Sequence, residues 1–168
     1  MNPTDFDQFH EILMRLGAAM LLGGSIGVNR DLHHKPAGLR VLAIVSVGSA
    51  LVTMLMLTVA NQQKNVTYDG LSRVVQGILQ GIGFLGAGVI MRAKGRNEIH
   101  GMTTAASVWL TAILGVACGL GQWQMSLAAF LVSVFILTIG RRIEKLILSL
   151  SSISNDAHAP LETPPPPS

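Results

Sequence analysis

The sequence predicts an all-α, polytopic membrane protein that folds as a helical bundle of about five transmembrane helices. Of its 168 residues, 49% are hydrophobic and only 12% are charged, and the mean hydropathy is +0.50. Soluble domains carry about a quarter charged residues, so this composition favours a membrane protein. Several apolar runs are also long enough to cross the roughly 30 Å hydrocarbon core of a bilayer.

The first predicted helix covers residues 12–28. The N-terminus before it, residues 1–11, carries acidic residues but no lysine or arginine. This charge does not suit a cleaved signal peptide, so we expect the helix to remain as a span. Arg15, near the outer end, is expected to extend to the lipid headgroups. Gly23 and Gly27 form a GxxxG pair, which favours close packing against another helix.

The remaining predicted helices are separated by polar loops that contain proline or glycine. The last helix grades into a basic amphipathic segment, and a proline-rich tail with the composition of a disordered chain follows it. We therefore expect a membrane domain at residues 12–150 and a disordered tail at residues 151–168. The helices are predicted at residues 41–60, 69–92, 102–120 and 125–139, and the amphipathic segment at residues 141–150.

The third predicted helix is unusually polar for a span. Asp69, Arg73, Gln76 and Gln80 recur at spacings of four, three and four residues, which places them on one helical face. A lipid-facing helix would not carry this row, so we expect it to face protein or a wet cavity. Asp69 and Arg73 are placed to form an ion pair. The polarity also leaves open a tilted or partly re-entrant segment.

Glycines crowd the same predicted helix, and three of them spell the GxGxxG dinucleotide fingerprint. That fingerprint requires a preceding strand inside a soluble βαβ unit, which an apolar span does not provide. We therefore reject a nucleotide site and predict that the glycines admit a neighbouring backbone. They are Gly77, Gly81, Gly83, Gly86 and Gly88.

Hydroxyl side chains form a row on the fourth predicted helix. Thr104, Ser107 and Thr111 follow one another at spacings of three and four residues. They are expected to face Gln76 and Gln80 and to share hydrogen bonds across the bundle. Such bonds average only about 0.6 kcal/mol in membranes, so an architectural role is favoured.

Basic residues gather in three polar segments that should lie on the same side of the membrane. The positive-inside rule then predicts an outside N-terminus and a cytoplasmic C-terminus. The same basic face suits either anionic lipid or an acidic partner, and the sequence does not separate these alternatives. Its residues are Arg30, Lys35 and Arg40 in the first segment, Arg92, Lys94 and Arg96 in the second, and Arg141, Arg142 and Lys145 in the third.

Several function classes find no support in the residues. Cys118 is the single cysteine, so no internal disulfide or cysteine metal cluster is expected. Aromatic residues are too scarce, at 5%, to stack single-stranded nucleic acid. No set of nucleophile, base and oxyanion donors is apparent, so we predict no enzyme, no cofactor and no metal site.

Four blocks of the sequence resemble the MgtC/SapB family of bacterial inner-membrane proteins over residues 15–144. The blocks are RLGAAMLLGGSIGVNR, KPAGLR, GIGFLGAGVIMR and GMTTAASVWLTA. The chain departs from the family pattern at Asn29, where a glutamate is usual, and at Gly77, where a glutamine is usual. It ends where longer members carry a further cytoplasmic domain, so the resemblance implies a short form.

The resemblance implies a regulator linked to growth in low magnesium and to survival inside host cells (virulence). Its expected mode of action is binding of membrane proteins, such as the F-type ATP synthase. The alternative is a small transporter or channel component for Mg²⁺ or another cation, with the polar row of the third helix lining a path. Self-association is also open. The candidate partner-binding residues are Arg15, Arg30, Arg40, Asp69, Arg73, Gln76, Gln80, Arg92, Thr104 and Ser107.

Overall fold

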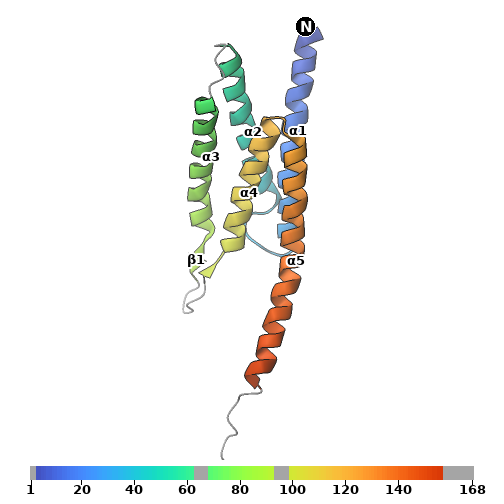
Figure 1. Cartoon of the computed structure of the whole chain (residues 1–168), viewed down its shortest axis with the longest axis vertical. Helices are drawn as coiled ribbons and strands as arrows, with labels where there is room; N and C mark the ends of the chain where they lie inside the picture. Colours follow the sequence, from blue (N-terminus) through green and yellow to red (C-terminus); the bar gives the residue numbers. More distant parts are fainter. Residues whose placement is uncertain (1–2, 63–67, 93–98, 157–168) are drawn as a thin grey trace, which may run out of the picture. The chain divides into compact units, whose positions relative to one another are not determined.

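The computed structural model describes residues 3–62, 68–92 and 99–156, and these residues confirm the predicted all-α architecture. Figure 1 labels the helices and colours them along the chain. A short antiparallel pair of two-residue strands, β1 (Met91–Arg92) and β2 (Ile99–His100), follows α3 and was not predicted. The helices are α1 (Pro3–Asp31), α2 (Leu39–Gln62), α3 (Tyr68–Val89), α4 (Met102–Gly119) and α5 (Trp123–Asp156).

Among the described residues, four helices are long and apolar enough to cross a membrane. Helix α3 is not one of them, because its charged and glutamine side chains lower its hydropathy. The prediction of five helices is therefore confirmed, but by length and composition only four of the described helices, rather than about five, are candidate membrane spans. The candidate spans are Phe6–Asp31, Leu39–Asn61, Met102–Gly119 and Trp123–Gly140.

The last helix also corrects a predicted boundary. Helix α5 has 34 residues and ends at Asp156, so the helix continues into the range that was assigned to the disordered tail. The rest of that tail, residues 157–168, lies outside the described residues. By contacts the chain divides into two compact units, Met1–Phe130 and Leu131–Ser168.

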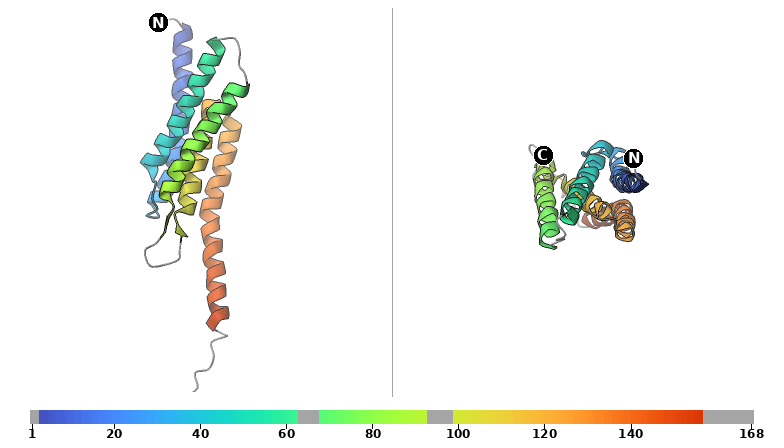
Figure 2. Two further views of the ribbon diagram at one scale, coloured as in Figure 1. Left: turned by 90° about the vertical axis from the view of Figure 1, so that its left-hand side faces the viewer. Right: turned by 90° about the horizontal axis from the view of Figure 1, so that it is seen from above.

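Within the first unit, α4 packs against α1, α2 and α3, and α1 also packs along α2 (Figure 2). The core where these helices meet is built of small side chains. Ala19, Ala50 and Cys118 are fully buried there. Small side chains let helices approach closely, which is how helices associate where the surrounding solvent is as apolar as they are.

Glycine pairs bring α1 and α4 into backbone contact with α2. A Cβ atom at Gly115 of α4 would lie 2.2 Å from the carbonyl oxygen of Ser46, and one at Gly119 would lie 2.6 Å from that of Ala50. On α1, a Cβ at Gly23 would lie 2.7 Å from Ser46 Cβ, and one at Gly27 would lie 2.4 Å from Leu39 Cα. Gly23 and Gly27 thus have the close contacts that the GxxxG pattern predicts.

Asp31 joins α1 to α2 across a tight turn. Its Oδ2 accepts a hydrogen bond of 2.9 Å from the backbone N–H of Leu39, the first residue of α2. The first N–H groups of a helix have no partner within the helix, and this carboxylate satisfies one of them. Its negative charge is also stabilised by the positive end of the helix dipole. Gly38 leaves room for it, because a Cβ there would overlap the carboxylate.

Replacing Asp31 with alanine is expected to lower the free energy of unfolding by about 1 kcal/mol, the usual cost of losing a side chain that caps a helix. Equilibrium unfolding of the purified protein in mixed detergent micelles measures it. Asp7→Ala is the matched control, because Asp7 is an exposed acid on α1, and it should change stability by less than about 0.5 kcal/mol. Equal effects of the two substitutions would contradict the capping role.

Candidate functional site

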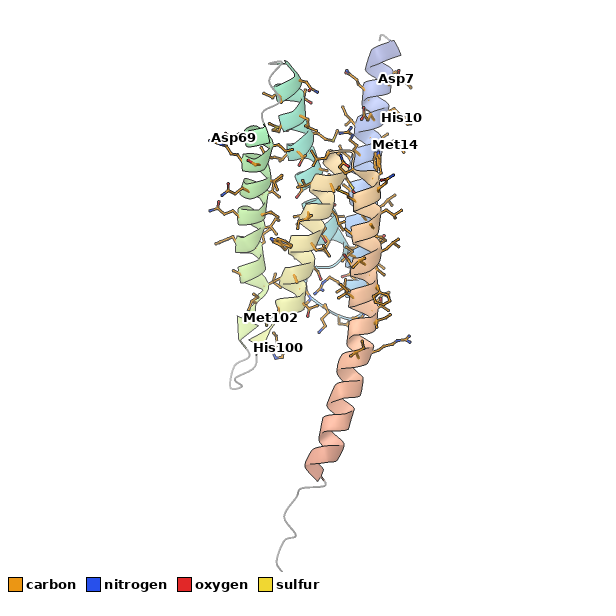
Figure 3. The ribbon with its side chains drawn as sticks, viewed as in Figure 1. Asp7, His10, Met14, Asp69, His100 and Met102 are labelled. Carbon is orange, nitrogen blue, oxygen red and sulfur yellow. The ribbon has the colours of Figure 1, made fainter. Side chains whose placement is uncertain are left out.

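The polar row of α3 lies on the exposed surface of the first unit. Arg73 Nη2 and Asp69 Oδ2 are 3.3 Å apart, and their side chains are 78% and 73% exposed. Asp69 points away from the other helices in Figure 3. Gln76 and Gln80 continue the row and are exposed as well. The four side chains thus share one face, as the spacing predicts, but none of them lines a cavity in the bundle interior.

The glycines of α3 do not pack as predicted. A Cβ atom at Gly77, Gly81, Gly83 or Gly88 would have no neighbouring atom within 4 Å, whereas Gly86 lies opposite Ala105, 3.5 Å from its Cβ. The packing prediction is therefore wrong within this chain for four of the five glycines. The physical reason is that α3 turns its aliphatic side chains, such as Val75 and Ile78, toward the bundle, which leaves most of its glycines on the open face.

The hydroxyl row of α4 faces α1 rather than α3. Thr104 and Ser107 are buried and bind the guanidinium of Arg30, which is 0% exposed at the end of α1. Arg30 Nη1 donates to Ser107 Oγ at 2.9 Å, and Nη2 donates to Thr104 Oγ1. The prediction that this row bonds to Gln76 and Gln80 is wrong, because those amides lie on the exposed face of α3.

Arg30 also holds the loop between α1 and α2. Its Nε and Nη2 each donate to the carbonyl oxygen of Pro36 at 3.3 Å, and Nη1 lies 3.5 Å from the carbonyl oxygen of Thr103. A planar guanidinium presents several donors in fixed directions, so one side chain joins α1, the loop and the start of α4. The sequence analysis predicted Arg30 in a basic polar loop available to a partner, whereas the structure buries it in the core at the end of α1.

Arg15 lies at the opposite end of the first unit, where its guanidinium contacts the end of α4; its extension to the lipid headgroups stays a prediction. Its Nη1 donates to the carbonyl oxygen of Gly119 at 2.7 Å, at the C-terminus of α4, and its Nη2 pairs with Glu11. A cation is favoured at this negative end of the helix dipole. Gly121, with φ of 72°, lies in the following turn, and a Cβ atom there would lie 3.0 Å from Arg15 Nη2.

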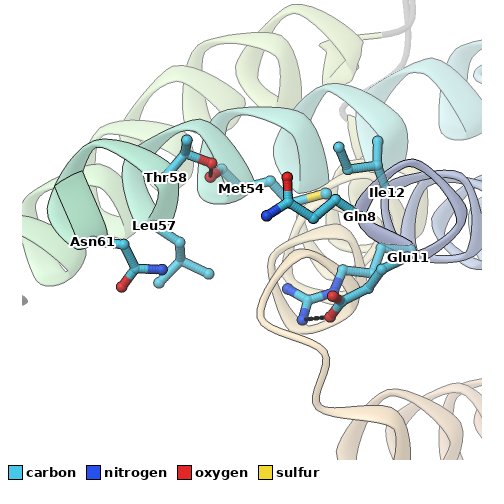
Figure 4. Close-up of a pocket in the computed structure, with 8 residues that line it drawn as sticks. Gln8, Glu11, Ile12, Met54, Leu57, Thr58 and Asn61 are labelled. Atoms are coloured by element: carbon cyan, nitrogen blue, oxygen red, sulfur yellow. Dashed lines mark hydrogen bonds and ion pairs between the residues drawn. The ribbon is translucent and has the colours of Figure 1, made fainter. Parts of the chain in front are cut away.

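An open cavity of about 610 Å³ with a mixed polar and apolar lining lies beside this arginine, between α1 and α2 (Figure 4). Its walls combine amide, carboxylate, guanidinium and hydroxyl groups with aliphatic side chains. The described residues include no group of three His, Cys, Asp or Glu side chains that is placed to hold a metal ion. The lining residues are Gln8, Glu11, Ile12, Arg15, Met54, Leu57, Thr58 and Asn61.

The remaining basic candidates are only partly described. Arg40 is exposed in the first turn of α2. Arg92 lies in β1, but its side chain is outside the described residues, as are Lys94 and Arg96. The three basic segments are therefore not shown to form one surface, and Arg30 in particular is unavailable to a partner because it is buried.

Sequence reasoning missed several residues that organise these sites. Glu11 lies four residues before Arg15, which is the spacing of an ion pair on one helical face, so the sequence did carry a signal for it. The carbonyl of Pro36, six residues after Arg30, carries none, because any backbone carbonyl can accept a hydrogen bond. Gly115 and Gly119 carry a clear signal, since GVACG is a further GxxxG pair and lies in an apolar helix.

Comparisons with known proteins agree on one family. A model described as the MgtC family matches residues 16–146. Protein SrpB of Synechococcus elongatus is 38% identical over 138 residues, which cover 79% of this chain and 76% of SrpB. Protein MgtC of Salmonella typhimurium is 40% identical over 82% of this chain, and Protein SapB of Bacillus subtilis is 38% identical over 72% of it. The alignments cover 57% of MgtC and 53% of SapB, and no solved structure matches.

Proposed function

Because the chain belongs to the MgtC family, we propose that it is a regulatory protein of the bacterial inner membrane that acts by binding other membrane proteins. One observation carries the proposal: α3 turns charged, amide and glycine residues outward rather than into the bundle. We call this surface the α3 face. Its residues are Asp69, Arg73, Gln76, Gly77, Gln80 and Gly81.

The chemistry of the α3 face suits another helix better than lipid. Hydrocarbon offers no hydrogen-bond partner to the amides of Gln76 and Gln80, whereas a polar side chain or carbonyl on a partner helix does. The open glycines Gly77 and Gly81 would let the partner backbone approach closely, and van der Waals contact over that approach favours association.

The family resemblance directs the choice of partner. We propose the membrane sector of the F-type ATP synthase, whose inhibition would link this protein to growth in low magnesium and to intracellular survival. Contacts through α3 use the part of the chain that the relatives share, since this helix lies inside the matched residues 16–146.

The interior of the first unit supports regulation over the transport alternative. Its buried hydroxyls at Ser49, Thr53 and Thr111 bond to backbone carbonyls one turn earlier. Helices α2 and α4 touch through backbone atoms at Gly115 and Gly119. A polar path for a hydrated cation needs open space, and close packing at these glycines leaves none between the two helices.

The test combines photo-crosslinking with a functional measurement. Gln80 is replaced by a photoreactive residue in magnesium-starved cells, and Ile44, which is 72% exposed on α2, serves as the control position. We expect crosslinks from position 80, but not from position 44, to a membrane subunit of the ATP synthase. In inverted vesicles, added protein should then lower ATP-driven proton pumping.

A double substitution separates docking from folding. Gly77→Leu with Gly81→Leu should abolish both the crosslink and the inhibition, because bulky side chains hold the partner away, while the fold has room for them. Gly48→Leu is the matched control, since Gly48 is equally open on α2, and it should leave both readouts intact. Proton pumping that is unchanged by the added protein would contradict the proposal. If the purified protein carries Mg²⁺ into proteoliposomes and Asp69→Asn abolishes that flux, the transporter alternative is favoured.

A further inference from the structure

Helix α5 continues well beyond the segment that can cross the membrane. Its candidate span is Trp123–Gly140, the charged residues Arg141 and Arg142 follow directly in the sequence, and the helix runs without a break to Asp156. At 1.5 Å per residue, residues 141–156 add about 24 Å of helix outside the span. We call them the α5 extension. Both the end of the span and the extension lie in the second compact unit.

The α5 extension carries the pattern of a coiled-coil seam. Ile143, Leu146, Leu150 and Ile153 are separated by three, four and three residues, and these are all the a and d positions of the extension. The twelve other residues of the extension include only two apolar ones, Ile147 and Leu148. The same register continues back into the span through Ile139, Ile136 and Val132, so the seam is unbroken across the end of the span.

This seam needs a partner. The side chain of Ile143, just beyond the span, is 51% exposed although it is large and apolar. The extension continues a longer helix and so need not be nucleated, but an apolar stripe on a helix outside the hydrocarbon core still favours packing against another apolar face. In the described part of the second unit, residues 131–156, this helix is the whole structure.

We infer that the α5 extension packs against the α5 extension of a second copy of this chain, in a parallel coiled coil. All copies cross the membrane in the same direction, so their extensions run parallel and in register. In that arrangement Arg142 at position g faces Ile147 at position e of the other copy, and Ser149 faces Ser154, so no like charges oppose each other.

An extension that lay flat on the lipid surface would have to bend where it leaves the span. The helix instead continues through Gly140 as one element to Asp156. Figure 1 draws α5 as one continuous helix, with no turn that would lay its end across the axis of the span. This inference does not depend on the proposed function, because it concerns α5 and not the α3 face.

Disulfide crosslinking of the full chain in native membranes tests the coiled coil. In a Cys118→Ser background, Leu146→Cys, Leu150→Cys and Ile153→Cys place thiols on the seam, whereas Ser151→Cys and Ser152→Cys place them at positions b and c. Parallel seam positions bring the two Cα atoms within disulfide reach, and the outer positions do not. Mild oxidation should therefore give several times more disulfide-linked dimer at the three seam positions than at the two control positions.

The results separate the alternatives. Equal crosslinking at all five positions, no dimer at any of them, or crosslinks only to a different protein would overturn the inference. Spin labels at the same positions provide an independent measurement. If lipid-soluble oxygen relaxes the seam labels and no spin–spin coupling between copies is seen, the seam lies in lipid and the inference is overturned. Spin–spin coupling confined to the seam positions would support it.

Discussion

Replacing Arg30 with alanine is expected to lower the free energy of unfolding by about 2–5 kcal/mol, the range for a large core truncation that also leaves buried polar groups without a partner. The substitution leaves the hydroxyls of Thr104 and Ser107 and the carbonyl oxygen of Pro36 without their donor, and it opens a cavity where a fully buried side chain stood. Equilibrium unfolding in mixed detergent micelles measures the loss.

Two further substitutions assign the loss to its cause. Arg30→Met fills the volume but removes the donors, so it should remain within about 1–2 kcal/mol of the alanine variant if hydrogen bonding dominates. Arg40→Ala is the matched control, because Arg40 is an exposed arginine near the same loop, and it should cost less than about 0.5 kcal/mol. A stability loss at Arg30 no larger than that at Arg40 would show that the buried network does not hold the fold.

Substituting Gly115 should be the second most damaging change. Its added Cβ would lie 2.2 Å from the carbonyl oxygen of Ser46, which is backbone and cannot rotate away. Helix α4 must then move from α2, and we expect Gly115→Ala to lower the free energy of unfolding by about 1–3 kcal/mol, as overpacked cores do. Gly115→Val should cost more, because it adds two further methyl groups where the Cβ alone already overlaps the backbone of α2.

The control for this prediction is a glycine substitution that we expect not to destabilise the protein. Gly48→Ala adds the same methyl group to the middle of α2, where no atom lies within 4 Å. Alanine is a better helix former than glycine by about 0.5–1 kcal/mol in soluble hosts, so this variant should be neutral or slightly more stable. If both substitutions stabilise the protein, the close approach of α2 and α4 is not the state that the protein adopts in the micelle.

The features that sequence reasoning predicted correctly are those that depend on neighbours along the chain. The membrane class follows from composition, and the helices follow from apolar runs bounded by proline and glycine. The placement of Asp69, Arg73, Gln76 and Gln80 on one face of α3 follows from 3.6 residues per turn. Each of these needs only local geometry, which a single sequence contains.

The errors concern which helix lies against which. The hydroxyl row of α4 was recognised as a row, but periodicity does not say that its partner is Arg30, 74 positions earlier in the chain, rather than the glutamines of α3. Arg15 was recognised as a charge near a helix end, yet its partner is a carbonyl of α4 that lies 104 positions away. Glycines signal close approach without saying which of them meet a neighbour.

The sequence by itself therefore determined that this is a helical membrane protein of the MgtC family and that α3 carries a polar, glycine-rich face. Only the tertiary structure decided that this face points outward, that Arg30 is a core residue, and that Gly115 and Gly119 bring α4 against α2. The reason is physical: a helix's own periodicity sets which residues share a face, while the direction of that face depends on the summed packing of all neighbouring helices.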